Sequence, residues 1–201
     1  MPATLYSDIL RQAAQTRFKY GDSALRDWFR DKALEVSQQE TSIGRMLNRK
    51  ASKANEVTAP RIGRLLMYRY DPKWKDVLPY YDTFPLIFPI EMYTDRFLGI
   101  NLHYLPPIFR ARLMDALYDT LNNDRYDAKT KLNINYKILK NASKYKYFKP
   151  CIKMYLKSHV KSQFIEIDIK EWDYCLFLPL ARFKKMSQRS VWDDSIRKIT
   201  G

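Results

Sequence analysis

The stretch Leu78–Tyr93, LPYYDTFPLIFPIEMY, decides the fold, because it is bulky and apolar yet contains three prolines. Proline has no backbone N–H and its ring clashes with the preceding turn of a helix, so this stretch is not helical. In sheets proline is confined to edges, strand starts and bulges, which predicts short or peripheral strands here. The following stretch Phe97–Leu102, FLGINL, predicts another strand. We therefore expect a small, irregular antiparallel β-barrel or sheet over residues 62–105.

Upstream of this β-rich stretch, the sequence predicts helices followed by a linker. Apolar residues recur at three- and four-residue spacing over residues 1–40, which is typical of amphipathic helices. Gly21, followed by two good N-cap residues, predicts a break between two helices. Residues 41–61 are polar and basic, so we expect a linker there. We expect residues 62–201 to form a single α+β domain, with a helical and basic part over residues 108–201.

Downstream of the β-rich stretch, the spacing of apolar residues predicts helices with one short strand between them. Ile108–Leu121 is expected to be a helix with Pro107 in its first turn, and a second helix is expected around Leu132–Ala142. A third helix is expected to begin at Pro150. Phe164–Lys170 alternates strictly between apolar and polar residues, which predicts a half-buried strand. Short helices are expected to close the chain.

The charge of the chain is strongly positive and unevenly distributed. Its 36 Lys and Arg outnumber 22 Asp and Glu, which gives a net charge of +14. The segment Ala128–Ile165 contains ten lysines and no Asp or Glu. Like charges four residues apart on a helix repel each other, so such a segment costs stability. The imbalance therefore favours a polyanion as the partner, above all the phosphate backbone of DNA.

Three groups of basic residues are candidate DNA contacts. Four lysines spaced by four would lie along one stripe of the helix expected from Pro150, and three more would lie on the polar side of the helix before it. Four basic residues of the linker are candidates for a second clamp. The candidates are Lys149, Lys153, Lys157 and Lys161 for the stripe, Lys137, Lys140 and Lys144 for the preceding helix, and Arg45, Arg49, Lys50 and Lys53 for the clamp. The alternative is a solvated helix face whose aromatic neighbours lie in the core.

The chain lacks the residues that several classes of protein function require. The chain has only five glycines, too few for glycine-rich phosphate loops. Two cysteines without a CxxC pair and two histidines leave little from which to build a zinc site or a catalytic triad, so no metal and no cofactor are expected. No apolar run approaches the roughly 20 residues that a membrane span needs, and no membrane partner is expected.

Two patterns have a catalytic interpretation beside a structural one. Glu166, Asp168 and Lys170 would share one face of a strand, as acid and lysine do in some metal-dependent nucleases. The isoleucines between them explain the same alternation without a metal. His103 would share a face with Asn101, and without a matched acid it is expected to be a hydrogen-bonded structural residue. We therefore expect a protein that is not an enzyme.

The chain also resembles a known family over most of its length. The stretches that carry the resemblance are Tyr70–Lys73, Leu78–Leu86, Phe97–Pro107, Trp28–Ala33, Ala142–Lys144, Phe148–Pro150 and Phe177–Pro179. They are similar to a family of small basic proteins of T-even-like tailed bacteriophages, some of which are labelled DNA end protectors. The resemblance implies a protein of the host cytoplasm and the virion that binds the ends of packaged double-stranded DNA and shields them from host exonucleases. It implies no active-site residues.

Two functions stay open at this point. The first is non-enzymatic binding of double-stranded DNA through the lysine-rich face. The second is a structural role in the neck, baseplate or capsid vertex, with the aromatic middle of the chain in contact with other virion proteins. The placement of the aromatic side chains between Tyr80 and Phe97 separates the two. Exposed rings would favour a protein interface, whereas buried rings together with lysines that converge on one concave face would favour DNA binding.

Overall fold

The computed structural model describes Asp8, Arg11 and residues 56–121, 123–167 and 181–201. Apart from Asp8 and Arg11, the helices predicted within residues 1–40 lie outside the described residues, and so does the predicted linker up to residue 55. The described part of the chain contains an antiparallel sheet, α-helices and short 3-10 helices. The α+β class expected from the sequence is confirmed.

Six strands form one sheet in which every neighbouring pair is antiparallel. Their order is β1-β7-β2-β4-β5-β6. The strands are β1 (Glu56–Val57), β2 (Leu66–Met67), β4 (Leu86–Met92), β5 (Arg96–Asn101), β6 (Ile152–Leu156) and β7 (Phe164–Glu166). A separate two-stranded ladder joins β3 (Tyr81–Asp82) to β8 (Phe183–Lys184). The antiparallel sheet expected over residues 62–105 is confirmed, and strands from outside that stretch extend it on both sides.

β4 lies in the interior of the sheet, between β2 and β5, although it contains Pro89. The expectation that prolines confine the strands here to edges or short pieces is therefore wrong for β4. Its pairing with β5 shifts register between Pro89 and Glu91, which marks a bulge where the missing N–H of proline is tolerated. The carbonyl oxygen of Pro89 accepts a 3.0 Å hydrogen bond from the N–H of Gly63.

The described α-helices begin where the sequence provides suitable first residues. They are α5 (Pro107–Leu121), α6 (Ala128–Ala142) and α8 (Gln188–Thr200). α5 begins at Pro107, as predicted, because the first residue of a helix has no use for its N–H. The side chain of Asp127 caps α6 by accepting a 2.6 Å hydrogen bond from the N–H of Thr130, and Ser187 caps α8 in the same way. The two helices predicted around Ile108–Leu121 and Leu132–Ala142 are thus confirmed.

The helix expected from Pro150 does not form. Lys146–Cys151 is a short 3-10 helix, η2, and β6 follows it directly. A spacing of four residues places side chains near one face of a helix, but also on one face of a strand, so the lysine spacing fits both structures. Among the described strands, β6 pairs only with β5 and lies at the edge of the sheet. The predicted helical stripe of lysines is therefore wrong.

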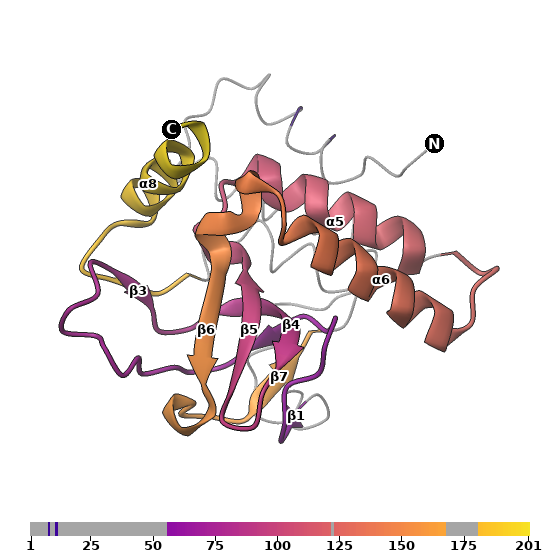
Figure 1. Ribbon diagram of the computed structural model, residues 1–201, viewed down its shortest axis with the longest axis horizontal. Coiled ribbons are helices and arrows are strands. Elements are labelled where there is room, and N and C mark those ends of the chain that lie inside the picture. The colour runs from indigo at the N-terminus through magenta and orange to yellow at the C-terminus, as the bar shows by residue number, and fades with distance from the viewer. Residues whose placement is uncertain (1–7, 9–10, 12–55, 122, 168–180) are drawn as a thin grey trace, which may run out of the picture.

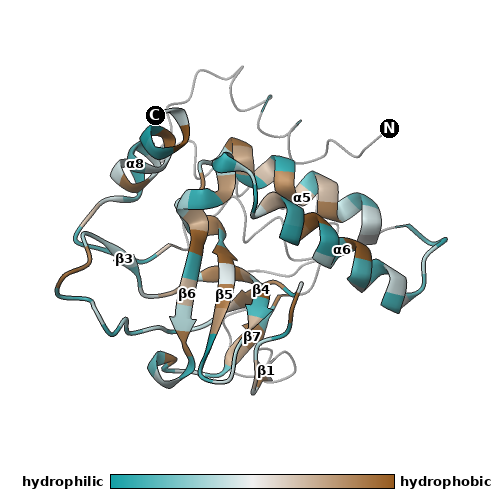
Figure 2. Ribbon diagram, viewed as in Figure 1, coloured by the Kyte–Doolittle hydropathy of each residue, from teal (hydrophilic) through white to brown (hydrophobic). Residues whose placement is uncertain are grey.

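Helices α5 and α6 lie side by side next to the sheet, and α8 lies apart from them (Figure 1). α8 contacts η2 and a second 3-10 helix, η1 (Leu102–Tyr104). Alternate residues of β4 enter two apolar clusters: Phe88 packs in the cluster shared with α5 and α6, and Ile87 packs in the other cluster with Tyr68. Figure 2 shows the hydrophobic residues of β4 and β5 at the centre of the molecule. β4 is thus buried on both faces.

The aromatic residues in the middle of the chain are mainly part of the core. Phe88 and Phe97 are fully buried and Tyr80 is nearly so, whereas Tyr93 in the β4–β5 turn is exposed. Tyr81 and Phe84 are half-buried. This distribution argues against an extended aromatic interface in the middle of the chain.

Candidate functional site

A cleft of about 720 Å³ opens between segments that are distant in the sequence. Its lining residues are Arg69, Tyr70, Asp71, Thr83, Phe84, Lys161, Arg182 and Lys184. Four of them are cations, and all four are exposed to solvent. Asp71 is the one carboxylate in this lining. We call this cavity the basic cleft.

Backbone hydrogen bonds tie the walls of the basic cleft together. The N–H of Lys161 donates to the carbonyl of Arg69 at 2.8 Å, and the N–H of Tyr70 donates to the carbonyl of Thr83 at 3.0 Å. The N–H of Thr83 in turn donates to the carbonyl of Arg182 at 3.0 Å. The cations therefore project from main chain that is fixed by strand-like pairing, which positions them before any ligand arrives.

The fourth cation, Lys184, belongs to β8 and pairs in register with Tyr81 of β3. The next residue, Lys185, has a φ of 69°, a conformation that costs energy for a residue with a side chain. Its ammonium group donates to the carbonyl oxygens of Asp76 at 2.8 Å and Leu78 at 2.9 Å. These bonds offset the strain. They also connect the end of β8 to residues 76–78, which precede β3.

The positive charge of the basic cleft is not neutralised within the described part of the protein. None of the four cations forms an ion pair among the described residues. The carboxylate of Asp71 is itself engaged, because it pairs with Lys75 at 3.1 Å. Four like charges around one cleft repel each other, so a ligand that carries several negative charges relieves this repulsion.

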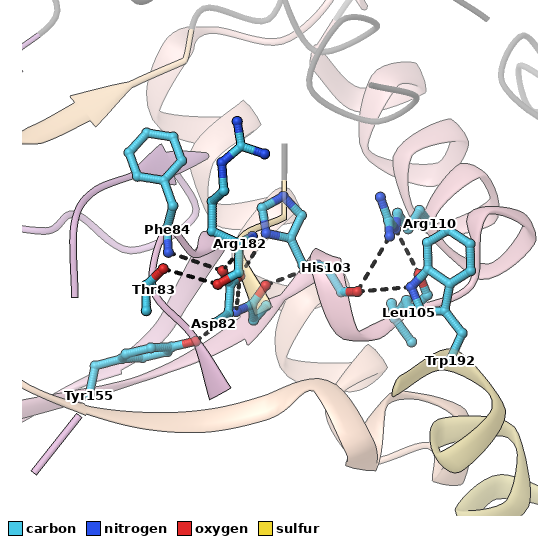
Figure 3. A network of polar contacts seen from close by, with 10 residues as sticks. Asp82, Thr83, Phe84, His103, Leu105, Arg110, Tyr155, Arg182 and Trp192 are labelled. Carbon is cyan, nitrogen blue, oxygen red and sulfur yellow. Dashed lines mark hydrogen bonds and ion pairs between the residues drawn. The ribbon is translucent and has the colours of Figure 1, made fainter. Parts of the chain in front are cut away.

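A buried carboxylate, Asp82, organises the backbone next to the cleft (Figure 3). Its Oδ1 atom accepts hydrogen bonds from the N–H of Phe84 at 3.0 Å and of Arg182 at 3.2 Å. Its Oδ2 atom accepts from the side-chain amide of Asn101 at 3.2 Å and lies 2.7 Å from Nδ1 of His103. The side chain of Arg182 points away from this carboxylate (Figure 3). Asp82 therefore fixes the backbone of Arg182 and leaves its guanidinium group available.

Burial determines the protonation of this pair. It lowers the pKa of His103 below the ordinary 6.5, against the opposing effect of the Asp82 carboxylate. Burial raises the pKa of Asp82, but the charge and hydrogen bonds of its partners outweigh burial and hold that pKa below its ordinary value. Near neutral pH the pair is thus a carboxylate that accepts a hydrogen bond from a neutral imidazole. Nε2 of His103 is buried without a partner among the described residues, which suits an unprotonated nitrogen better than an N–H.

A second cavity, of about 460 Å³, shares Tyr70 with the basic cleft. Six aromatic side chains line it, namely Tyr70, Trp74, Tyr80, Tyr81, Tyr104 and Tyr155. Its cations are Lys73, Arg96 and Lys153. Nζ of Lys153 lies 4.2 Å from the centroid of the Tyr104 ring. Burial, with repulsion from Lys198, lowers the pKa of Lys153 to about 8. We call this cavity the aromatic groove.

The lysines predicted around α6 and η2 lie in different environments. Lys137 and Lys144 are exposed on and just after α6, and Lys149 is exposed in η2. Lys140 is half-buried and pairs with Glu91 at 3.4 Å. Lys137, Lys144 and Lys149 can therefore attract an anion electrostatically, whereas the charge of Lys140 is paired with Glu91.

The lysines predicted to follow Pro150 lie in three separate places. Lys153 lines the aromatic groove, and Lys161 lines the basic cleft. Lys157 donates to the carbonyl oxygens of Tyr93 and Thr94 at 2.7 and 3.1 Å, so it stabilises the β4–β5 turn. The predicted clamp residues Arg45, Arg49, Lys50 and Lys53 lie outside the described residues.

Sequence reasoning missed three of the four cations of the cleft, namely Arg69, Arg182 and Lys184. A local signal for Arg69 exists, since it stands between Tyr68 and Tyr70, and alternation places a residue between two buried ones on the exposed side. No local signal brings Arg182 to the same place, because the pairing of distant segments does not follow from spacing.

The nuclease interpretation gains no support from the described residues. Glu166 pairs with Arg64 at 3.3 Å, whereas Asp168 and Lys170 lie outside the described residues. Within the described ranges, no group of three or more His, Cys, Asp or Glu side chains is placed to hold a metal ion. The described helices also include none that is both long and apolar enough to cross a membrane.

The fold and the cleft together define a class, a small α+β protein with a preformed basic site that can accept phosphate groups. The family comparison is more specific. Residues 18–195 match the family described as the phage T4 terminal DNA protecting protein, and the chain belongs to this family. The resemblance noted in the sequence is thereby confirmed, and so is the prediction of a protein that is not an enzyme, since the family is one of DNA-protecting proteins. No curated protein and no solved structure matches the chain.

Proposed function

We propose that this protein binds the end of double-stranded DNA in the basic cleft and thereby shields that end from host exonucleases. The observation that carries the proposal is the set of four cations without ion pairs on a hydrogen-bonded backbone. Lys and Arg bind phosphates without reading the base sequence. Such contacts suit a protein that protects DNA ends irrespective of their sequence, as the description of its family suggests.

Protection of this kind needs no catalysed reaction, because it works by steric exclusion. An exonuclease has to hold the terminal nucleotides in its own active site, and a protein that occupies the same phosphates excludes it. The proposed places of action are the host cytoplasm and the virion, where a linear phage genome has free ends.

The lysine-rich face predicted from the sequence enters this proposal in a modified form. Lys161 contacts a phosphate directly, because it lines the cleft. Lys137, Lys144 and Lys149 are exposed and add attraction at a distance. A second contact through the linker completes the proposal, formed by Arg45, Arg49, Lys50 and Lys53.

A binding titration with matched variants tests the proposal. A labelled blunt duplex is titrated with the protein, and a covalently closed circle of equal mass serves as competitor. We expect the circle to compete poorly, and the double variant Arg69→Ala, Lys184→Ala to lose affinity about tenfold or more, since contacts to phosphates dominate such affinities. Lys129→Ala, an exposed lysine outside the cleft, is the control. Equal competition by the circle, or full affinity of the double variant, would contradict the proposal.

Contact with other virion proteins is a second proposal, and the groove between α5 and α6 favours it. This groove measures about 370 Å³ and its lining includes Phe109, Leu113 and Ile138. Tyr145 and Tyr147 stand at it with exposed rings, and exposed tyrosines are common at protein interfaces. The double variant Tyr145→Ser, Tyr147→Ser should keep its affinity for DNA and be incorporated less into phage particles. Normal incorporation would argue against this second role.

A further inference from the structure

The aromatic groove has the features of a site for unpaired nucleotides. Of the six rings in its lining, Trp74 is exposed and Tyr81 is half-buried, and cations lie beside them. Bases stack on such rings whatever their identity, because every base has a π face. Its volume of about 460 Å³ lies within the roughly 300–1,000 Å³ of pockets that hold small ligands. That volume suits a single nucleotide.

Trp74 is the ring best placed to meet a base. Its side chain is 62% exposed, so a large apolar surface faces water at the opening of the groove. Its backbone is nevertheless held, since its carbonyl oxygen accepts hydrogen bonds from the N–H groups of Val77 at 3.1 Å and Leu78 at 3.0 Å. Nζ of Lys73 lies 5.1 Å from the centroid of the indole ring. The exposed indole ring of Trp74 therefore lies beside the ammonium group of Lys73, which a phosphate can approach.

Tyr70 connects the groove to the basic cleft, because it lines both cavities. Its hydroxyl oxygen accepts a 3.1 Å hydrogen bond from the N–H of Leu156, and its ring packs edge-on against Tyr155 with the centroids 5.0 Å apart. This side chain is therefore fixed between the two sites. The two cavities are therefore adjacent, on either side of one fixed side chain.

The charge inside the groove also suits a nucleotide. Lys73, Arg96 and Lys153 line it, whereas its one carboxylate, Asp82, is buried and already accepts four hydrogen bonds. Arg96 pairs with Asp95 at 3.7 Å, but a neutral aromatic ligand would leave Lys73 and Lys153 without a counter-charge from the lining of the groove. A nucleotide brings a ring for the aromatic walls and a phosphate for the cations.

We propose that the aromatic groove captures an unpaired nucleotide at the end of the DNA, with its base stacked on Trp74 and its phosphate facing Lys153. This inference rests on the proposed function, because it assumes that the adjoining duplex lies in the basic cleft. It adds a preference among ends: a single-stranded overhang or a frayed end is bound more tightly than a blunt end.

The test compares three labelled DNAs of equal duplex length, with a blunt end, a short 3′ overhang or a short 5′ overhang, the opposite end being closed by a hairpin loop. We expect the protein to bind at least one overhang more tightly than the blunt end. Trp74→Ala should weaken binding to that overhang by about 5- to 150-fold, the range expected for the loss of one stacked base, and leave the blunt end unchanged. Trp74→Phe should restore most of the affinity, and Tyr126→Ala, an exposed ring outside both cavities, should have no effect.

A fluorescent base provides a second readout that does not depend on affinity. 2-Aminopurine at the unpaired terminal position should be quenched on binding to the wild-type protein, because stacking quenches it, and should stay bright with Trp74→Ala. Equal affinity of the wild-type protein for all three ends, or unchanged binding and quenching in Trp74→Ala, would overturn the inference. The proposed function fails separately, if Arg69→Ala, Lys184→Ala binds all three DNAs as tightly as the wild-type protein.

Discussion

The backbone N–H of Lys161 lies 2.8 Å from the carbonyl oxygen of Arg69 and donates a hydrogen bond to it, so the main chain fixes two cations of the cleft next to each other. The bond does not involve either side chain. Replacing one of these side chains therefore removes a charge and leaves the wall of the cleft in place. Variants of the cleft residues are for this reason clean probes of binding.

The dependence of the DNA-binding constant on salt concentration should report the number of phosphates that the cleft contacts. The four contacts in the cleft contribute about −3.6 to the slope of the logarithm of the binding constant against the logarithm of the salt concentration, and contacts through the linker make the slope steeper. Lys161→Ala and Arg182→Ala should each reduce the steepness by about 0.9, because each removes one phosphate contact. Fluorescence anisotropy between low and physiological salt measures these slopes. Lys137→Ala should change the slope less, and an equal change would show that the exposed face of α6 holds phosphate as closely as the cleft.

Asp82→Asn should destabilise the protein. The substitution removes the charge that His103, Asn101 and two backbone N–H groups surround, and it places an N–H₂ group where an acceptor is needed. Leaving buried donors without their acceptor costs about 1–3 kcal/mol in the free energy of unfolding. Urea denaturation measures that loss. Asp95→Asn, at an exposed carboxylate in the β4–β5 turn, should change it by less than about 0.5 kcal/mol. An Asp82→Asn protein as stable as the wild type would contradict the role given to this network.

Stability should fall as the pH is lowered from 7 to 5. Because the pKa of His103 is lowered in the folded protein, the unfolded chain binds more protons below about pH 6.5, and acid favours unfolding. The lowered pKa of Asp82 adds to this loss below about pH 4. His103→Gln can still donate a hydrogen bond to Asp82 but cannot titrate. Thermal unfolding at a series of pH values should therefore show a weaker dependence between pH 7 and 5 in this variant, and an identical dependence would assign the effect to other groups.

Lys153 should stabilise binding at a cost in folding stability. Burial holds its pKa at about 8, below the ordinary 10.5, so the free energy of unfolding should rise as the pH rises above 8 and the folded protein releases this proton. Lys153→Met removes the buried charge and should raise stability at pH 7 by about 1 kcal/mol, with a flatter profile between pH 7 and 9. The same variant should bind an overhanging DNA end more weakly. A less stable Lys153→Met protein would contradict this account.

The fold was predictable to the extent that local patterns determine it. The prolines of Leu78–Tyr93 exclude a helix, and the apolar spacing of Ile108–Leu121 together with Pro107 is sufficient to predict α5. The central position of β4 was not predictable, because it depends on a bulge at Pro89 that only the pairing with β5 reveals. The spacing of the lysines after Pro150 failed for a different reason, since four is a multiple of the strand period as well as close to a helical turn.

The candidate site was predictable only in its chemistry. The net charge and the segment without acids point to an anion, and Lys161 was named as a contact from the sequence. Its neighbours Arg69, Arg182 and Lys184 come from three other places in the chain, and only backbone pairing between these places unites them. The role of Asp82 was not predictable, because nothing near it in the sequence signals the histidine that lies beside it in the fold.

The edge position of β6 has a consequence for how the protein behaves at high concentration. A strand with one unpaired side is a template onto which a second copy can add, and such pairing leads to aggregates and fibrils. Lys153 lies in β6 and Lys157 directly follows it, and charged lysines along an edge oppose the approach of an identical strand. A regular spacing that looks like a DNA-binding pattern thus also protects each copy of the protein from its neighbours, which matters wherever many copies are made in a confined volume.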